Sequence, residues 1–235
     1  MKRLISLLCV LTLVFSLAAC GNEQTKVDTP TTTPAGQPAT TPNSAPTDAD
    51  ATLPDTPSAE DGKTLVVFFS MPDDVDDSTV EIDGKTLGNT QYMAQIIQQT
   101  TNADIFRIEP ETPYPTNHEE LVDLAKEEQN NNSRPAIKDT IANFESYDTV
   151  FVGYPIWWSD LPMILYTFFD TYDFTGKTIV PFSTHGGSSF AGTPATIAEL
   201  EPEATIAEGM TVSRNDIQDA AQDVIDWLQS DGYAE

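Results

Sequence analysis

The feature that most constrains the fold is an alternation of short apolar runs with helical periods, which begins at Lys63 and continues to the end of the chain. The runs are rich in β-branched and aromatic residues, and the first of them, residues 65–69, contains no polar residue. Such runs are typical of strands that are buried on both faces of a parallel sheet. Further runs, the last of them weak, lie at residues 104–108, 149–153, 178–182 and 210–212. The pattern predicts an α/β fold with a five-stranded parallel sheet.

Helical periods separate some of these runs. Apolar residues three or four positions apart indicate amphipathic helices, each of which can close a right-handed crossover between parallel strands. The apolar positions are Met93, Ile96 and Ile97; Leu121, Leu124 and Ala125; and Ile217, Ala221, Val224, Ile225 and Leu228. Helices on both faces of the sheet would make the domain a three-layer, doubly wound structure.

The first 19 residues have the pattern of a secretory signal peptide. Lys2 and Arg3 precede an apolar run at residues 4–17, which is too short for a comfortable membrane span. Two alanines and Cys20 follow, and this ending resembles the lipobox of bacterial lipoproteins, in which the cysteine is acylated. We therefore expect a signal peptide at 1–19, lipidation of Cys20 and an extracytoplasmic location at the bacterial cell membrane. A plain signal peptide with an incidental cysteine is the alternative.

Composition divides the remaining chain into a tether and one folded domain. Residues 20–61 are rich in Thr, Pro, Ala and Asp and have almost no large apolar residue, so they cannot offset the entropy of ordering. We expect a disordered tether there and a folded domain at 62–235. The net charge of −26 argues against nucleic acid or anionic lipid as a partner, because phosphates attract basic surfaces. Membrane association is then expected through the lipid anchor only.

The tripeptide Gly-Lys-Thr occurs at Gly62, Gly84 and Gly176 and could suggest a nucleotide triphosphatase. A phosphate-binding loop of that class needs another glycine five positions earlier and must lead from a strand into a helix. None of the three copies has that glycine. We interpret all three as turns.

A hydrolase and a calcium-binding protein are two further hypotheses with weak support. Residues 187–191 come within one residue of a nucleophile elbow, and His118 or His185 could act as its base. The motif is broken, however, and no oxyanion loop is evident. The acidic residues 73–77 lack the spacing and the glycine of a calcium loop. We therefore predict a solvated acidic loop, no catalytic residue and no metal site.

Three segments that follow strands carry groups suited to a phosphorylated planar ligand, and open parallel sheets bind ligands at this edge. In the first segment, Ser70 ends a run, and Gly88, Asn89 and Thr90 later open a helix. The N–H groups and dipole of a helix N-terminus can hold a phosphate without lysine or arginine. We expect these four residues to form a phosphate site.

The second segment consists of Pro155, Ile156, Trp157 and Trp158, directly after the third run. A planar ring could stack on one of the two indoles, which would bury a large area of the ring. We expect one tryptophan to belong to the core and the other to face the ligand.

The third segment is Ser183, Thr184, His185, Gly186 and Gly187, after the fourth run. In a glycine-rich turn the backbone N–H groups can approach the polar edge of a planar ligand. His185 could stabilise negative charge on such a ligand, or it could make a purely structural hydrogen bond.

With these motifs the domain resembles the flavodoxin family, in particular flavodoxin-like proteins that carry Tyr-Pro-Ile-Trp-Trp and Thr-His-Gly-Gly-Ser after their third and fourth strands. The resemblance covers the chain from Lys63 to its end. It implies non-covalent FMN, a sheet of order 2-1-3-4-5 and a redox function. By this resemblance, the first segment matches the family's phosphate loop, the second its ring-stacking loop and the third its remaining flavin loop. The N–H groups of the third loop would approach the pyrimidine edge of the flavin, and His185 could stabilise its reduced, anionic form.

One departure from the family pattern is an insertion at residues 71–87, between the first strand and Gly88. Its second half predicts a small hairpin that turns at Asp83 and Gly84. The insertion carries six acidic residues, which would repel a phosphate if they covered the site. We therefore expect the hairpin to point outward, to leave the helix N–H groups available and to permit FMN binding; a hairpin that covers the crevice is the alternative.

The leading function is electron transfer or flavin-dependent reduction, with a redox partner protein or a small-molecule electron acceptor. One alternative is an NAD(P)H-dependent quinone reductase, although the loops have few basic residues for a 2′-phosphate. The other is a flavin-less binding or interaction module, because a fold alone does not establish an activity.

Overall fold

The computed structural model describes residues 64–71 and 78–235. The expected signal peptide, the lipidated Cys20 and the tether lie outside the described residues, as do the acids at 73–77. Within the described part of the chain, no helix has the length and the apolar character needed to cross a membrane.

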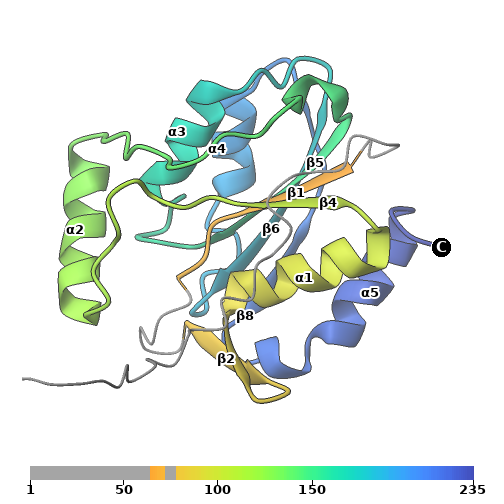
Figure 1. The fold of residues 1–235 in the computed structure, drawn as a ribbon, viewed down its shortest axis with the longest axis horizontal. Helices are drawn as coiled ribbons and strands as arrows, with labels where there is room; N and C mark the ends of the chain where they lie inside the picture. The colour runs from red at the N-terminus through yellow and green to blue at the C-terminus, as the bar shows by residue number, and fades with distance from the viewer. Residues whose placement is uncertain (1–63, 72–77) are drawn as a thin grey trace, which may run out of the picture. The chain divides into compact units, whose positions relative to one another are not determined.

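A parallel sheet forms the centre of the domain (Figure 1). Its strands lie in the order β4 (Asp104–Arg107), β1 (Thr64–Phe68), β5 (Thr149–Pro155) and β6 (Thr178–His185). Beyond β6 the edge position is shared by β7 (Thr205–Ile206) and β8 (Met210–Ser213), which both pair with β6 in parallel. The predicted α/β fold and the order 2-1-3-4-5 are confirmed, except that the fifth strand consists of two short pieces.

The break between β7 and β8 follows from a proline in the neighbouring strand. Gly209, with φ of 73°, lies directly against the carbonyl oxygen of Pro181, and a Cβ at this position would overlap that oxygen. The N–H and C=O of one residue point to the same side of a strand, so the N–H that Pro181 lacks would also have faced this edge. The ladder loses a donor there, and the edge strand is interrupted.

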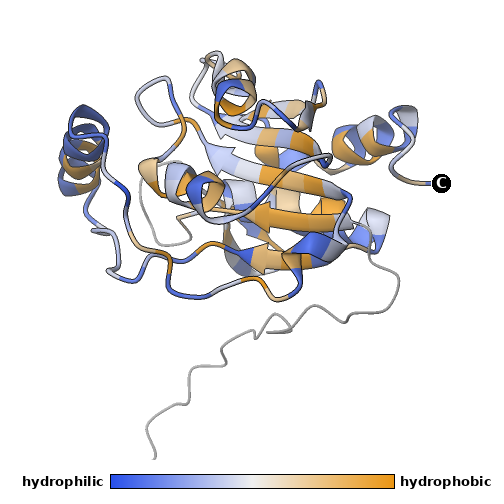
Figure 2. Cartoon of the chain, turned by 90° about the horizontal axis from the view of Figure 1, so that it is seen from above, coloured by the Kyte–Doolittle hydropathy of each residue, from blue (hydrophilic) through white to orange (hydrophobic). Residues whose placement is uncertain are grey.

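Both faces of the sheet are buried, as the unbroken apolar runs predict. In β1, Leu65 and Val67 face one core, whereas Val66 and Phe68 face the other, and all four side chains are fully buried. Figure 2 shows the hydrophobic strands in the middle of the domain, with hydrophilic residues on the outer surfaces of the helices. The sheet therefore separates two apolar cores.

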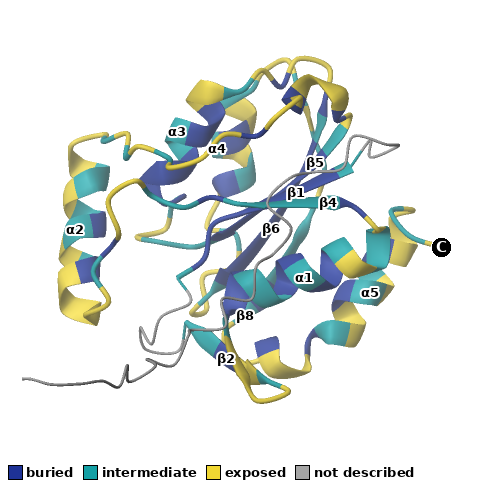
Figure 3. Cartoon of the chain, viewed as in Figure 1, coloured by how far each residue is buried: buried dark blue, intermediate teal, exposed yellow. Residues whose placement is uncertain are grey.

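Among the described residues, two helices cover each face of the sheet. On one face, α1 (Asn89–Thr101) and α5 (Ala221–Ser230) turn their buried residues toward the strands (Figure 3). The short helix η2 (Ile217–Asp219) precedes α5, so the helical period that begins at Ile217 is divided between two helices. On the other face lie α3 (Met163–Thr171) and α4 (Thr193–Leu200).

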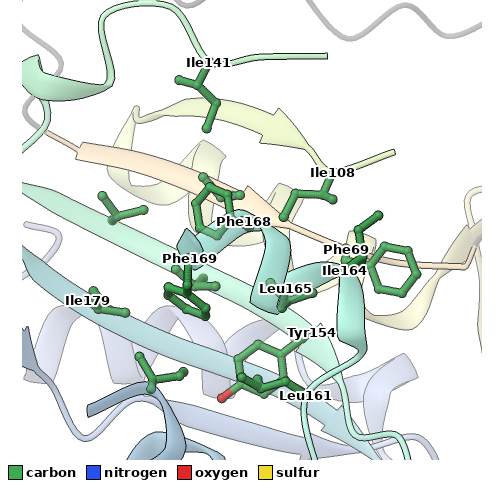
Figure 4. Close-up of a cluster of buried hydrophobic side chains, with 14 of the residues drawn as sticks. Phe69, Ile108, Ile141, Tyr154, Leu161, Ile164, Leu165, Phe168, Phe169 and Ile179 are labelled. Carbon is green, nitrogen blue, oxygen red and sulfur yellow. The ribbon is translucent and has the colours of Figure 1, made fainter. Parts of the chain in front are cut away.

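The sequence analysis did not predict α3 or α4. In α3, five of nine residues are buried, and its Phe168 and Phe169 lie in the aromatic core with Tyr154 (Figure 4). A helix that is buried on much of its circumference lacks the polar face that reveals a helical period. The eight residues of α4 are too few to show a period clearly.

Helix α2 (His118–Asn130) stands at the carboxyl end of the strands, at the left of Figure 1. The side chain of Asn117 caps it by accepting a hydrogen bond from the N–H of Glu120, at 3.1 Å. Its buried residues are Leu121 and Ala125, and Leu121 belongs to the core on the α3 side. This position lets α2 form a wall of a site at the end of the sheet.

The predicted hairpin is present as β2 (Thr79–Ile82) and β3 (Lys85–Gly88), paired antiparallel. Its two turn residues, Asp83 and Gly84, have φ of 51° and 75°, as a two-residue turn between twisted strands requires. Val80 is buried in the core on the α1 side, and the side-chain amide of Gln218 donates to the carbonyl of Glu81 at 3.1 Å. The hairpin therefore packs beside α1 and η2.

The Gly-Lys-Thr copies at Gly84 and Gly176 both lie in turns with φ of 75°, and Gly62 lies outside the described residues.

Candidate functional site

A cavity of about 370 Å³ lies at the carboxyl end of the sheet, where β1 and β5 are neighbours. The chain leaves β1 toward the α1 face and leaves β5 toward the α3 face, so this is the point at which the strand order reverses. Ligands of doubly wound sheets bind at this position. The lining comes from residues at the ends of β1, β5, β6 and β8 and from the nearby parts of α1 and α2.

The first predicted segment forms a polar side of the cavity. Ser70, Asn89 and Thr90 line it, together with Ser78, which the sequence analysis did not single out. Gly88 does not line the cavity, but a Cβ there would overlap the Ser70 Oγ and come within 3.0 Å of the Met71 carbonyl oxygen. The missing side chain of Gly88 thus brings the start of α1 against the end of β1.

Two amides at the start of α1 already have acceptors within the protein. The N–H of Asn89 donates to the carbonyl of Ser78 at 2.8 Å, and the N–H of Gln91 donates to Ser70 Oγ at 3.3 Å. The N–H of Thr90 has no acceptor among the described residues. The expectation that the hairpin leaves these amides available is therefore wrong for Asn89. Its hydrogen bond to Ser78 continues the ladder that pairs Thr79 with Gly88.

A pair of buried hydroxyls joins α1 to β6 beside these amides. Thr90 Oγ1 and Thr184 Oγ1 are 2.8 Å apart, the two side chains are 1 % and 4 % exposed, and both line the cavity. One hydrogen bond between two hydroxyls uses only one of their two hydrogens. The pair therefore retains a hydrogen that it can donate to a ligand.

The second predicted segment, from Pro155 to Trp158, forms part of the apolar side, and all four of its residues line the cavity. The ring of Trp157 packs edge-on against Phe69 and Tyr114, at centroid distances of 5.4 and 5.5 Å. Trp158 is 49 % exposed. Trp157 is thus fixed in the edge of the core, and Trp158 is the indole with a large accessible face. That this face stacks on a ligand stays a prediction.

Trp158 is held in a tight turn. Trp157 and Asp160 exchange both backbone hydrogen bonds, at 3.0 and 2.9 Å, and the two residues between them, Trp158 and Ser159, have φ of 50° and 63°. The indole N–H donates to the carbonyl of Val122 at 3.1 Å, and Lys126 Nζ lies 4.9 Å from the ring centroid. Left-handed backbone at two non-glycine residues is uncommon and persists where the surroundings hold it. The indole is therefore positioned by its turn and by α2.

The third segment is only partly a loop. Ser183, Thr184 and His185 extend β6, because β8 pairs with all three residues and β5 pairs with the first two. Ser183 is fully buried, bonds to Thr211 Oγ1 and does not line the cavity, and Gly187 does not line it either. The expected glycine-rich loop at 183–187 is therefore wrong in its first half. Thr184, His185 and Gly186 do line the cavity.

His185 makes the structural hydrogen bond. Its Nδ1 accepts from the N–H of Gly187 at 2.9 Å, so the remaining ring proton is on Nε2. Burial lowers the pKa of His185 from its usual 6.5, and the charge of Asp216 opposes that shift. The hydrogen bond from Gly187 and the lowered pKa both favour the neutral imidazole, which agrees with the structural role rather than with charge stabilisation of a reduced flavin.

The sequence analysis missed several lining residues, namely Met71, Ser78, Leu121, Val122, Ala125 and Arg214; it had considered His118 only as a hydrolase base. Arg214 directly follows β8, so the rule that ligands bind beyond strand ends could have pointed to it.

Ser188 and Ser189 are exposed and are not among the lining residues, which argues against a nucleophile elbow at this cavity. Among the described residues, no group of three or more His, Cys, Asp or Glu could hold a metal ion.

Comparison with known proteins agrees with this geometry. A family model described as flavodoxin matches residues 84–230, which is more than half of the chain. The chain belongs to the flavodoxin family. Most of its insertion at 71–87 lies before the matched region, whereas the second and third site segments lie within it.

Solved structures of flavodoxin-like proteins are also similar. A candidate flavoprotein from Bacteroides eggerthii is 28% identical with a TM-score of 0.54, and the alignment covers 71% of this chain and 96% of that chain. A flavoprotein from Lactobacillus acidophilus, solved in complex with FMN, is 19% identical with a TM-score of 0.50, and the alignment covers 68% and 99% of the two chains. The second likeness shows the fold alone. The comparison with curated proteins found no match.

Proposed function

We propose that the domain binds FMN non-covalently in this cavity and acts in electron transfer or flavin-dependent reduction. We further propose that a lipid on Cys20 holds it at the outer face of the cell membrane. The observation that carries the proposal for FMN is the division of the cavity into a polar side at the start of α1 and an apolar side formed by Trp158, Ile156 and α2. FMN has the same division, between a phosphate and a flat ring.

The residues present fit each part of FMN. On the polar side, Ser78 Oγ is buried and has no hydrogen-bond partner among the described residues, and the Thr90–Thr184 pair has a hydrogen to donate. On the apolar side, Ile156, Val122 and Trp158 offer the surface on which a ring gains burial and stacking. A volume of about 370 Å³ is typical of a ligand pocket. When bound, FMN would supply the one- and two-electron chemistry that these side chains cannot perform.

The surrounding charge would influence the redox chemistry. With a net charge of −26, the chain disfavours an anionic reduced flavin and so would lower its reduction potential. The acceptor can be a small molecule or a partner protein, and a basic protein surface would be attracted to this domain.

One observation favours a second candidate function, a flavin-less interaction module. The Asn89 N–H, which the family resemblance assigns to the phosphate, is hydrogen-bonded to Ser78 at the base of the hairpin. If that bond is retained, the phosphate site has one donor fewer. The hairpin acids Glu81 and Asp83, by contrast, are exposed and are not among the lining residues, so they do not block the cavity.

Titration of the purified mature chain with FMN, followed by tryptophan fluorescence and the visible spectrum, tests the proposal. Val122→Trp fills the cavity from α2 and should abolish binding. Asp123→Trp places the same bulk on the exposed side of the same helix and should bind FMN as the parent does. The flavoprotein proposal would be refuted if added FMN neither quenched the tryptophan fluorescence of the parent chain nor changed its own visible absorption spectrum.

A second chain, with residues 71–87 shortened to a two-residue link, tests the alternative. Equal FMN affinity in both chains would show that the hairpin leaves the site intact. Binding by the shortened chain alone would show that the insertion has replaced the flavin site. NADH or NADPH oxidation with a quinone acceptor then tests whether the loaded protein is a quinone reductase.

A further inference from the structure

Ser78, the residue directly before β2, carries a buried hydroxyl that has no partner in the protein. Its Oγ makes no hydrogen bond within the described part of the chain, and the residue lines the cavity. A hydroxyl can donate one hydrogen bond and accept two, and burying it without a partner is unfavourable. Such groups are rare in native proteins, and some of them serve a functional role. The Ser78 hydroxyl is therefore a candidate contact for a ligand.

The start of α1 keeps few donors for an anion. Of the four amides at residues 88–91, three already donate to acceptors within the protein, at 2.8–3.4 Å. One of these three, the amide of Asn89, donates to the carbonyl of Ser78. Among the described residues, this leaves the Thr90 amide and the spare hydrogen of the Thr90–Thr184 hydroxyl pair. A helix N-terminus that binds an anion normally presents several free N–H groups, so a further donor is needed here.

The Ser78 hydroxyl lies beside the amide that the hairpin occupies. Oγ and the carbonyl oxygen of a serine are each two bonds from its Cα, and the Ser78 carbonyl oxygen is 2.8 Å from the Asn89 nitrogen. Asn89 and Thr90 line the same cavity as Ser78. One torsion sets the position of a serine Oγ, so the hydroxyl can turn between staggered positions toward a ligand. The insertion thus occupies one donor at the start of α1 and places another next to it.

The charges around this point favour an anion. Neither Asp nor Glu is present among the described residues that line the cavity, and the first turn of α1 has no acidic residue. The positive end of the α1 dipole lies at the same place. We propose that Ser78 donates its hydroxyl hydrogen to the phosphate of FMN and replaces the Asn89 amide as a donor. The insertion is then part of the phosphate site. This inference rests on the proposed function.

The test compares the binding of FMN and of riboflavin to the mature chain and to two variants. Ser78→Ala should weaken FMN binding by about tenfold, the loss expected for one hydrogen bond to a charged group, and should change riboflavin binding by less than about twofold. Thr79→Val removes the hydroxyl of the next residue, which pairs with Gly88 and is not among the lining residues, and should change neither affinity. Equal losses for both flavins in Ser78→Ala, or an unchanged FMN affinity, would overturn the proposal.

Thermal unfolding separates a ligand contact from a structural role. Because the Ser78 hydroxyl has no partner in the protein, Ser78→Ala should not lower the thermal midpoint without ligand, and a lower midpoint would indicate a structural role instead. Inorganic phosphate should raise the midpoint of the parent and of Thr79→Val more than that of Ser78→Ala. If the parent binds no flavin but shows this difference, the FMN proposal fails while the phosphate contact at Ser78 stands. If phosphate stabilises the parent and Ser78→Ala equally, the assignment of Ser78 is wrong.

Discussion

Replacing Gly88 with alanine should destabilise the domain through one steric conflict. The backbone of Gly88, with φ of −64° and ψ of 143°, is open to any residue, so no backbone strain is involved. The new Cβ, however, would overlap Ser70 Oγ and lie 3.0 Å from the Met71 carbonyl oxygen. Ser70 is 4 % exposed, so its side chain has little room to rotate away.

The expected cost combines three terms. Displacement of Ser70 breaks its hydrogen bond from the Gln91 N–H, which is worth about 1 kcal/mol. Overpacking of a buried site typically costs about 1–3 kcal/mol. Alanine has a lower backbone entropy than glycine in the unfolded state, which stabilises the folded state by about 0.4–1 kcal/mol. The net loss in the free energy of unfolding should therefore be about 1–3 kcal/mol.

A double-mutant cycle measured by urea unfolding checks this reasoning. Ser70→Ala alone should cost about 1 kcal/mol, because it removes the acceptor of the Gln91 amide. The double variant should cost about 1 kcal/mol less than the sum of the single variants, since the overlapping oxygen is gone. Gly186→Ala serves as the control: its Cβ would have no neighbour closer than 3.5 Å and should change stability little. Additive effects of Gly88→Ala and Ser70→Ala would refute the steric explanation.

Three further predictions concern the ligand, the charge and the anchor. Trp158→Ala should weaken FMN binding by about 1–3 kcal/mol in a fluorescence titration, and an unchanged affinity would exclude this indole as the stacking surface. Burial, with the charges of Asp173 and Asp170, raises the pKa of Glu201 to about 7, so its favourable contribution to stability is present at low pH and is lost as pH rises from about 4.5 to 7. Glu201→Gln should raise stability at pH 8 by about 1 kcal/mol after allowance for solvent screening, and an unaltered pH profile of unfolding would contradict this. Mass spectrometry of the mature N-terminus should find acyl chains on Cys20; an unmodified Cys20 in the soluble fraction would disprove the anchor.

Local patterns in the sequence were sufficient for the central architecture. The unbroken apolar runs at β1 and β5 reflect burial on both faces, and the turn at Asp83 and Gly84 needs only local backbone preferences. The start of α1 was visible for the same reason, because Gly88 and the residues after it mark a helix N-terminus locally. In α3 the helical period is masked by burial on several sides, so this helix was missed.

The sequence by itself thus determined the parallel α/β fold, the hairpin and the strand ends where the site segments lie. Only the tertiary structure decided which groups of these segments remain available to a ligand. The Ser78 carbonyl accepts the hydrogen bond of the Asn89 N–H, and the pairing of β6 with β5 and β8 buries Ser183. The chain after β8 places the Arg214 side chain beside Gly186. Hydrogen-bond partners and cavity linings depend on contacts between residues far apart in the chain, whereas strand and turn patterns depend on neighbours in sequence.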